Sequence, residues 1–395
     1  MMKIKYGMVA CLCCLVLGCA SNGQGAGSQS VNNANAADKV LNTLDSMDSQ
    51  SDVAAAETDN GFASVNFFRA FAADAAKAPV ATLDKHFSNR PAKAYIKTIY
   101  PDESEAGFVD VSWDKLLPTT FHKMMEQVAG LERWEFIHSQ TEGNYIQSYF
   151  ALGSDDSFDY LCFTWDRDEQ NIVNIRQMLY RYGLAEALVA MDRVMESSEY
   201  TQLEKVSFIQ TMHAINNREY VLFDKYFSLL SPELQSEPFI RDRLLKDVAV
   251  GMDEEWLSFV EQQWTTTPQT HSSFYGYYLS RNDYDNAVVT LNSLPEFIAN
   301  HVGIHIEQTA LYLEMDKIGL ANHYANESIL SDPYLTTPYY YKLMISLKAI
   351  DYEGALLTLH VLRDRFNVEY SKADILEMEG GKEFTKSSFG RRYFG

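Results

Sequence analysis

The sequence predicts a multidomain protein in which an α+β module, made of helices and a four-stranded antiparallel sheet, precedes an all-α region of helix hairpins. Three observations support this prediction. Four short segments rich in aromatic and β-branched residues lie between positions 133 and 178. Three alanines, Ala287, Ala321 and Ala355, follow one another at intervals of 34 residues. Residues 19–60 are instead rich in Ser, Asn, Gly and Ala, and this composition predicts a disordered tether.

The α+β module is expected over residues 61–178. Phe67, Phe68 and Phe71 mark a first helix, and Pro118–Leu131 marks a second one with apolar residues three or four apart. Polar turn clusters separate the predicted strands, which cover 133–140, 144–152, 158–165 and 172–178. Helices followed by such a meander resemble the cystatin-like or nuclear-transport-factor-2-like cone. The resemblance is one of element order and implies a curved sheet that can enclose a small ligand.

From residue 179 to 370 the apolar spacing predicts helices only. Upstream hairpins are expected to pair 179–195 with 203–214, 219–230 with 238–249, and 254–264 with 271–280. The clearest pattern follows them, because an apolar residue lies three positions before each of the spaced alanines. A step of about 34 residues is the spacing of helix-turn-helix units that stack side by side.

The stretch from about 268 to 370 resembles tetratricopeptide repeats. In this resemblance Ala287, Ala321 and Ala355 are the small residues at which two antiparallel helices cross, and Pro333 follows a second helix, which a residue without an N–H stops. The glycine that the family often has five positions before the alanine is absent from all three units. The resemblance implies a curved stack whose first helices form a concave face. An irregular helical bundle with coincidental spacing is the alternative.

Five residues of the expected first helices form the candidate partner groove: Glu307, Glu314, Tyr340, Tyr341 and Met344. Aromatic and acidic side chains together suit an extended peptide that carries basic residues. The alternative is that the tyrosines pack between neighbouring units. Residues 371–395 are expected to cap the stack, with Ser371 beginning a helix and the aromatic residues of the tail covering the last hairpin.

The N-terminus has the layout of a secretory signal. Lys3 and Lys5 precede the apolar run Gly7–Leu17, which is too short to cross a bilayer. Cys19 follows directly after a glycine. This ending resembles the lipobox of bacterial lipoproteins, and the resemblance implies that residues 1–18 are removed and that Cys19 carries the lipid anchor. An ordinary secreted protein and a short membrane anchor are the alternatives.

The residues after Cys19 bear on its location. Ala20 and Ser21 differ from the aspartate signal that keeps lipoproteins in the inner membrane. The resemblance therefore implies a protein of the bacterial cell envelope, anchored to the outer membrane and facing the periplasm.

Charge and motifs limit the classes of function. The formal net charge of −21 argues against nucleic acid as a partner. Cys162 lies in an apolar run and is expected to be a buried thiol. His301 and His305 are four residues apart, but the segment His-Val-Gly-Ile-His lacks the glutamate of a zinc protease. We therefore predict no catalytic residue, no metal site and no cofactor.

The sequence thus predicts a non-enzymatic, membrane-anchored periplasmic lipoprotein that binds a protein or peptide partner through its helical repeats. One alternative is small-ligand binding or enzymatic activity in the α+β module, with the repeats as docking or dimerisation support. Its expected cavity lining is aromatic: Trp134, Tyr145, Tyr149, Phe163 and Trp165. A purely structural spacer is the other alternative.

Overall fold

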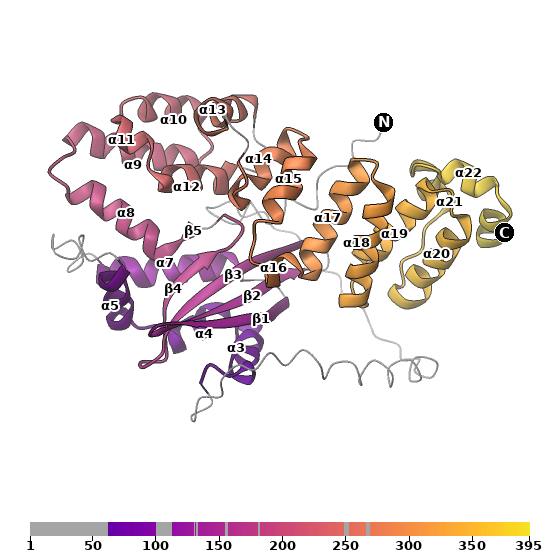
Figure 1. The fold of residues 1–395 in the computed structure, drawn as a ribbon, viewed down its shortest axis with the longest axis horizontal. Helices are drawn as coiled ribbons and strands as arrows, with labels where there is room; N and C mark the ends of the chain where they lie inside the picture. Colours follow the sequence, from indigo (N-terminus) through magenta and orange to yellow (C-terminus); the bar gives the residue numbers. More distant parts are fainter. Residues whose placement is uncertain are drawn as a thin grey trace, which may run out of the picture.

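The computed structural model describes residues 62–99, 113–129, 131, 133–154, 157–180, 182–248, 253–265 and 269–395. The expected signal segment at 1–18, the lipidation site Cys19 and the tether at 19–60 lie outside the described residues. Figure 1 shows a sheet, an arc of helices above it, and a row of helix hairpins that leads away from the sheet to the C-terminus.

The sheet is antiparallel throughout, and each strand pairs with the next one in the chain. Its strands are β1 (Arg133–Glu142), β2 (Tyr145–Ser154), β3 (Ser157–Asp166), β4 (Asn171–Gln177) and the two-residue β5 (Tyr182–Gly183). The predicted four-stranded antiparallel sheet followed by helices is therefore confirmed, with β5 as a short addition. Two residues connect β1 to β2 and four connect β3 to β4, because antiparallel hairpins need only a few residues to reverse the chain.

Four described helices precede the sheet: α3 (Val65–Lys77), α4 (Pro79–His86), α5 (Asn89–Ile99) and α7 (Trp113–Gln127). Aromatic rings join α3 to one face of the sheet. The Phe71 ring lies 5.4 Å from Phe150, 5.2 Å from Phe163 and 5.1 Å from Trp165, measured between ring centroids. All four side chains are buried, so this face carries the hydrophobic core of the α+β module.

Prolines explain where the predicted helices differ from the observed ones. The second helix was expected to begin at Pro118, but α7 begins at Trp113 and contains Pro118 as an interior residue, at the loss of one backbone hydrogen bond. The helices α4 and α5 were not predicted. Pro79 and Pro91 lie in their first turns, where the missing N–H removes no helical bond.

After β5 the described chain is helical. The arc above the sheet contains α8 (Leu184–Glu196), α9 (Gln202–Asn216), α10 (Tyr220–Phe227), α11 (Pro232–Gln235), α12 (Pro238–Val248) and α13 (Glu254–Trp264). The chain then returns to the sheet through η1 (Ser272–Phe274), α14 (Tyr275–Ser280), α15 (Tyr284–Leu291), α16 (Glu296–Ala299) and α17 (Val302–Glu314). The outer row consists of α18 (Ile318–Ser331), α19 (Thr337–Lys348), α20 (Tyr352–Phe366), α21 (Lys372–Glu377), α22 (Gly381–Lys386) and α23 (Ser388–Phe394).

The hairpins α14–α15, α17–α18 and α19–α20 share one turn geometry. Asn282, Asp316 and Ile350 adopt left-handed backbone conformations with φ of 56°, 56° and 61°. The N–H of the next residue in each turn donates to a carbonyl five positions back, at 2.8–2.9 Å. This is the Schellman arrangement that ends a helix, usually with glycine in the left-handed position. Here three non-glycine residues adopt the left-handed conformation at intervals of 34 residues.

The spaced alanines lie one turn into the second helix of each hairpin. Ala287, Ala321 and Ala355 are all completely buried. The second helix of the middle hairpin, α18, ends at Ser331, and Pro333 lies two residues beyond that end. Small buried residues let two helix axes approach closely, and the complete burial of the three alanines is compatible with such close packing.

Upstream, the observed helix pairing differs from the expected one. The expected hairpin paired residues 203–214 with 179–195. In the structure this segment forms α9, which packs mainly against α10. A tight turn joins α9 to α10, in which Arg218 has a φ of 56° and the Glu219 N–H donates to the Ala214 carbonyl at 2.9 Å. This turn could not be predicted from the sequence, because it lacks glycine and does not lie on the 34-residue spacing.

The C-terminal residues cover the last hairpin. Ser371 caps α21 by accepting a hydrogen bond from the Asp374 N–H, and two further short helices follow where only a tail was expected. Phe384 is completely buried, and Phe389 and Phe394 pack against the same small core. Aromatic residues thus shield the apolar end of the outer row from water.

The turn residue Ile350 provides a test of backbone strain. A β-branched residue at positive φ costs about 1–2 kcal/mol, and Ile350 is 70% exposed, so it has little packing to lose. We expect Ile350→Gly to raise the free energy of unfolding by about 0.5–1 kcal/mol after the greater chain entropy of glycine is subtracted. Urea denaturation should show a higher midpoint than wild type and than Ile350→Ala. A lower midpoint would contradict the assigned backbone conformation.

Candidate functional site

A hollow at the ends of α17 and α19 contains two of the five predicted groove residues, Glu314 and Met344. Its volume is about 190 Å³. The full lining, which defines the α17–α19 hollow, consists of Leu313, Glu314, Met344, Lys348, Met378 and Glu379. The first helices of two successive hairpins and the residues that follow α21 therefore contribute to one surface.

The lining of the hollow includes two pairs of residues with the same sequence spacing. Glu314 and Lys348 are 34 residues apart, as are Met344 and Met378. Glu314 is the last residue of α17 and Lys348 the last residue of α19. Lys348 and Met378 were not predicted as groove residues, although the same 34-residue step leads to them from Glu314 and Met344.

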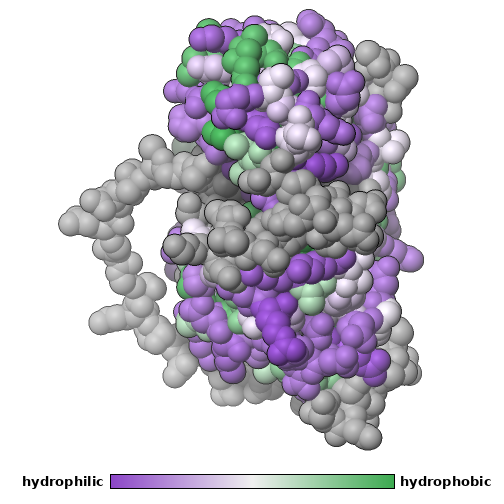
Figure 2. Space-filling model, turned by 90° about the vertical axis from the view of Figure 1, so that its left-hand side faces the viewer, coloured by the Kyte–Doolittle hydropathy of each residue, from purple (hydrophilic) through white to green (hydrophobic). Residues whose placement is uncertain are grey.

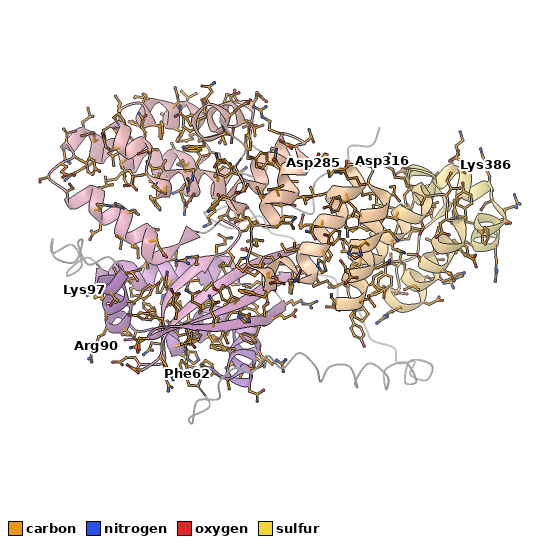
Figure 3. All side chains as sticks on the ribbon, in the orientation of Figure 1. Phe62, Arg90, Lys97, Asp285, Asp316 and Lys386 are labelled. Atoms are coloured by element: carbon orange, nitrogen blue, oxygen red, sulfur yellow. The ribbon has the colours of Figure 1, made fainter. Side chains whose placement is uncertain are left out.

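Lys348 is held in place by two carboxylates. Its Nζ lies 3.1 Å from Asp316 Oδ1 and 3.2 Å from Glu379 Oε2. Burial alone would lower the pKa of Lys348, but hydrogen bonds to these two carboxylates outweigh burial and raise the pKa. Figure 3 labels Asp316 at the upper tip of the α17–α18 hairpin. The ammonium group of this lining residue is therefore already paired.

Glu314 has no such partner. Its side chain is exposed, and within the described parts of the chain no hydrogen bond or ion pair compensates its charge. The carboxylates of Asp316 and Glu379 contact the Lys348 ammonium group, whereas Glu314 adds a further negative charge to the lining of the hollow.

The other three predicted groove residues support packing instead. Glu307 is partly buried and its Oε2 accepts a hydrogen bond of 2.6 Å from the Tyr275 hydroxyl of α14, and burial raises the pKa of both groups. Tyr340 stacks on Tyr370 at 6.5 Å, and Tyr341 packs against the small cluster around Leu335. Glu307 and Glu314 are two helical turns apart on one face of α17, but α14 covers only the Glu307 end.

A polar seam fixes α17 to the sheet. His301 caps α17, because its Nδ1 accepts from the Gly303 N–H at 3.2 Å and lies 3.0 Å from the Tyr160 hydroxyl of β3. An accepting Nδ1 leaves the proton on Nε2, which lies 3.6 Å from Glu135 Oε2 of β1. We call His301, Tyr160, Glu135 and Arg133 the sheet–α17 seam.

The seam continues to α18. Arg133 Nη2 lies 3.0 Å from Glu135 Oε2 and 2.6 Å from Asp332 Oδ2, the residue that ends α18. The His301 ring and then Arg133 lower the pKa of the Glu135 carboxyl to about 2, against the opposing effect of burial. This chain of charges connects β1 to both helices of the hairpin that carries Glu314.

His301, His305 and Cys162 make contacts with neighbouring groups of the fold. The His301 ring is used in the seam, and the His305 ring lies 5.7 Å from Tyr324. Among the described residues, no group of three or more His, Cys, Asp or Glu side chains could hold a metal ion. Cys162 is buried, and burial raises the pKa of its thiol to about 12, so it is protonated at neutral pH.

The aromatic residues considered as a cavity lining contact other side chains of the core. Phe163 and Trp165 pack on Phe71, as described above, and the Trp134 ring lies 6.3 Å from Phe163. The other two, Tyr145 and Tyr149, lie against Tyr95 and Phe297 at 4.8 Å and 4.7 Å. These five rings fill space in the α+β module.

A second exposed surface lies on the helical arc. Figure 2 shows hydrophobic residues at the top of the molecule, above a mainly hydrophilic lower part. Leu203, Val206 and Ile209 are exposed at three-residue spacing along α9, so they form one stripe of that helix, which we call the α9 stripe. This stripe is apolar only, whereas the α17–α19 hollow combines charge with apolar side chains.

Comparison of the chain with protein-family models, curated proteins and solved structures finds no match. Within the described residues, no helix has both the length and the apolar character needed to cross a bilayer.

Gly303 tests the close approach of α17 to the sheet. A Cβ at this position would lie 2.6 Å from Phe158 Cγ and 2.6 Å from the Tyr160 hydroxyl. We expect Gly303→Ala to destabilise the protein by about 1–3 kcal/mol through overpacking, measured by urea denaturation. Gly319→Ala in α18 is the matched control, because its Cβ would meet nothing within 4 Å, and it should stabilise by about 0.5–1 kcal/mol. Equal effects at both positions would contradict the contact.

Glu135 tests the seam by its pH dependence. Because its pKa is lowered from 4.5 to about 2, its carboxylate stabilises the fold above pH 4.5, and this contribution is lost as the pH falls towards 2. Glu135→Gln should therefore be less stable than wild type at neutral pH, and the two denaturation curves should converge near pH 2. The side chain is 43% exposed, so solvent screens the interaction and the difference will be modest.

A double-mutant cycle with His301→Gln gives the control for this prediction. The coupling between positions 135 and 301 should be favourable at pH 6 and absent near pH 2. A difference between wild type and Glu135→Gln that is independent of pH would show that the charge of Glu135 plays no part.

Proposed function

We propose that this protein is a non-enzymatic adaptor that binds a peptide segment of a partner protein at the α17–α19 hollow. The observation that carries the proposal is the lining of the hollow, which includes two pairs of residues 34 positions apart, Glu314 with Lys348 and Met344 with Met378. A surface built in this way continues along a row of helices, as an extended segment requires.

The proposal includes a tetratricopeptide-like stack in the C-terminal region. Two features with the same 34-residue step support it: the left-handed turn residues Asn282, Asp316 and Ile350, and the buried alanines one turn further on. Closely packed hairpins of this kind create binding surfaces from their first helices, and α17 and α19 are the first helices that line the hollow.

The proposal also includes membrane anchoring through Cys19, with the folded part in the periplasm at the outer membrane of a bacterium. Its support is the N-terminal sequence, namely the lysines, the apolar run and the cysteine after Gly18. A lipid anchor would keep the adaptor near partners of the cell envelope.

Binding rather than catalysis is supported by the role of the ionisable groups whose pKa values are shifted, because these groups make contacts within the fold. The Glu307–Tyr275 pair and the Glu135–His301 pair are engaged in packing contacts between elements. The thiol of Cys162 is protonated and buried. In this structure these groups serve the fold, whereas the exposed charge of Glu314 is available to a partner.

Site-specific photocrosslinking tests the adaptor function. A benzoylphenylalanine at position 344 should crosslink to a protein in native envelopes, because it replaces a residue of the hollow. The matched control is position 357 on the outer side of α20, where Leu357 is 61% exposed and should give no specific product. Loss of the 344 product when Glu314→Lys is added would support the assignment. Absence of a product at 344, or the same products at both positions, would contradict it.

A further inference from the structure

We infer that the α17–α19 hollow recognises a lysine or arginine next to an aliphatic side chain in an extended segment of the partner. This inference rests on the proposed function and specifies the chemistry of its partner. It derives from three properties of the hollow, which are its size, its charge and the flexibility of its apolar lining.

Size favours a peptide side chain over a small molecule. Pockets for small ligands usually measure about 300–1,000 Å³ and enclose most of the ligand. The hollow measures about 190 Å³ and lies at the ends of helices, where one side remains open. A pocket of this size accommodates one or two side chains while the rest of the peptide runs along the surface.

Charge favours a basic group. Glu314 is uncompensated within the described residues, and Asp316 and Glu379 share the single ammonium group of Lys348. A guanidinium or ammonium group beside Glu314 would balance the excess negative charge of the rim. An acidic residue would be repelled, and the net charge of −21 of the whole chain adds to this repulsion over longer distances.

The apolar lining favours an unbranched or aliphatic neighbour. Leu313, Met344 and Met378 supply the apolar part of the hollow. Methionine has three rotatable bonds and a polarisable sulfur, so it adapts to side chains of different shape. Lysine and arginine also have long apolar stems that pack along such surfaces while their charged heads remain in water. The lining can therefore hold the stem of the basic residue and the side chain beside it.

Peptide selection on the full chain tests this inference. The probe is a library of fluorescein-labelled heptapeptides randomised at three central positions, selected against the immobilised protein. We expect enrichment of Lys or Arg next to Leu, Met or Ile. Hydrogen–deuterium exchange should show protection of α17 and α19 by the selected peptides. Binding should weaken with salt, because the charges are exposed.

Variants separate charge from fold. Glu314→Gln should weaken a selected basic peptide by about two- to fivefold at low salt, the range of an exposed ion pair. Its binding of the analogue with Gln in place of Lys should be unchanged. The matched control is Glu353→Gln, which removes the same charge from the exposed side of α20 and should leave both affinities unchanged. Glu314→Lys should shift the selection towards acidic peptides.

The outcomes distinguish the inference from the proposed function. Peptides that protect α17 and α19 but show no preference for a basic residue would overturn the inference and leave the adaptor function standing. Peptides that protect only the α9 stripe, or a selection that yields no binder, would overturn both. Equal weakening by Glu314→Gln and Glu353→Gln would assign the preference to the overall charge of the chain and overturn the role of Glu314.

Discussion

The contact between α17 and β3 determines where the C-terminal half of the molecule lies. Gly303 allows the backbone of α17 to approach Phe158 and Tyr160 directly, and His301 uses Nδ1 to cap the helix and contact the sheet at the same point. The helix has 13 residues, so its two ends are about 20 Å apart. One end is therefore fixed to the sheet, and the other end carries Leu313 and Glu314 into the hollow.

The sheet could be predicted from sequence because its signals are local. Alternating aromatic and β-branched residues separated by polar turns specify strands within about ten residues, and the observed bounds agree with the predicted ones. The described helices before the sheet were harder to predict, because Pro118 looks like a helix start when only neighbouring residues are considered. Pro79 and Pro91 likewise resemble breaks although they lie in first turns.

The candidate site could be predicted only in part, because helical spacing is a local signal and burial is not. Helical spacing correctly indicates that Glu307 and Glu314 share a face of α17, but it does not reveal that Tyr275 of another helix covers one of them. Burial of a given turn depends on contacts between elements far apart in the chain. Lys348 and Met378, in contrast, follow from the 34-residue step alone. Periodicity predicts which positions are equivalent, and tertiary packing decides which of them are open to a partner.

The apolar packing of the outer row is divided into small clusters. A large core extends from α3 to Leu311 of α17, whereas α19–α23 pack around a separate cluster that includes Leu343, Leu359 and Phe384. Clusters that share few side chains can open independently of one another. Loosening of the outer cluster would disperse Met344, Lys348 and Met378 while the sheet stayed folded. The shape of the hollow thus depends on a local equilibrium of the last helices, and it can be lost while most of the described chain stays folded.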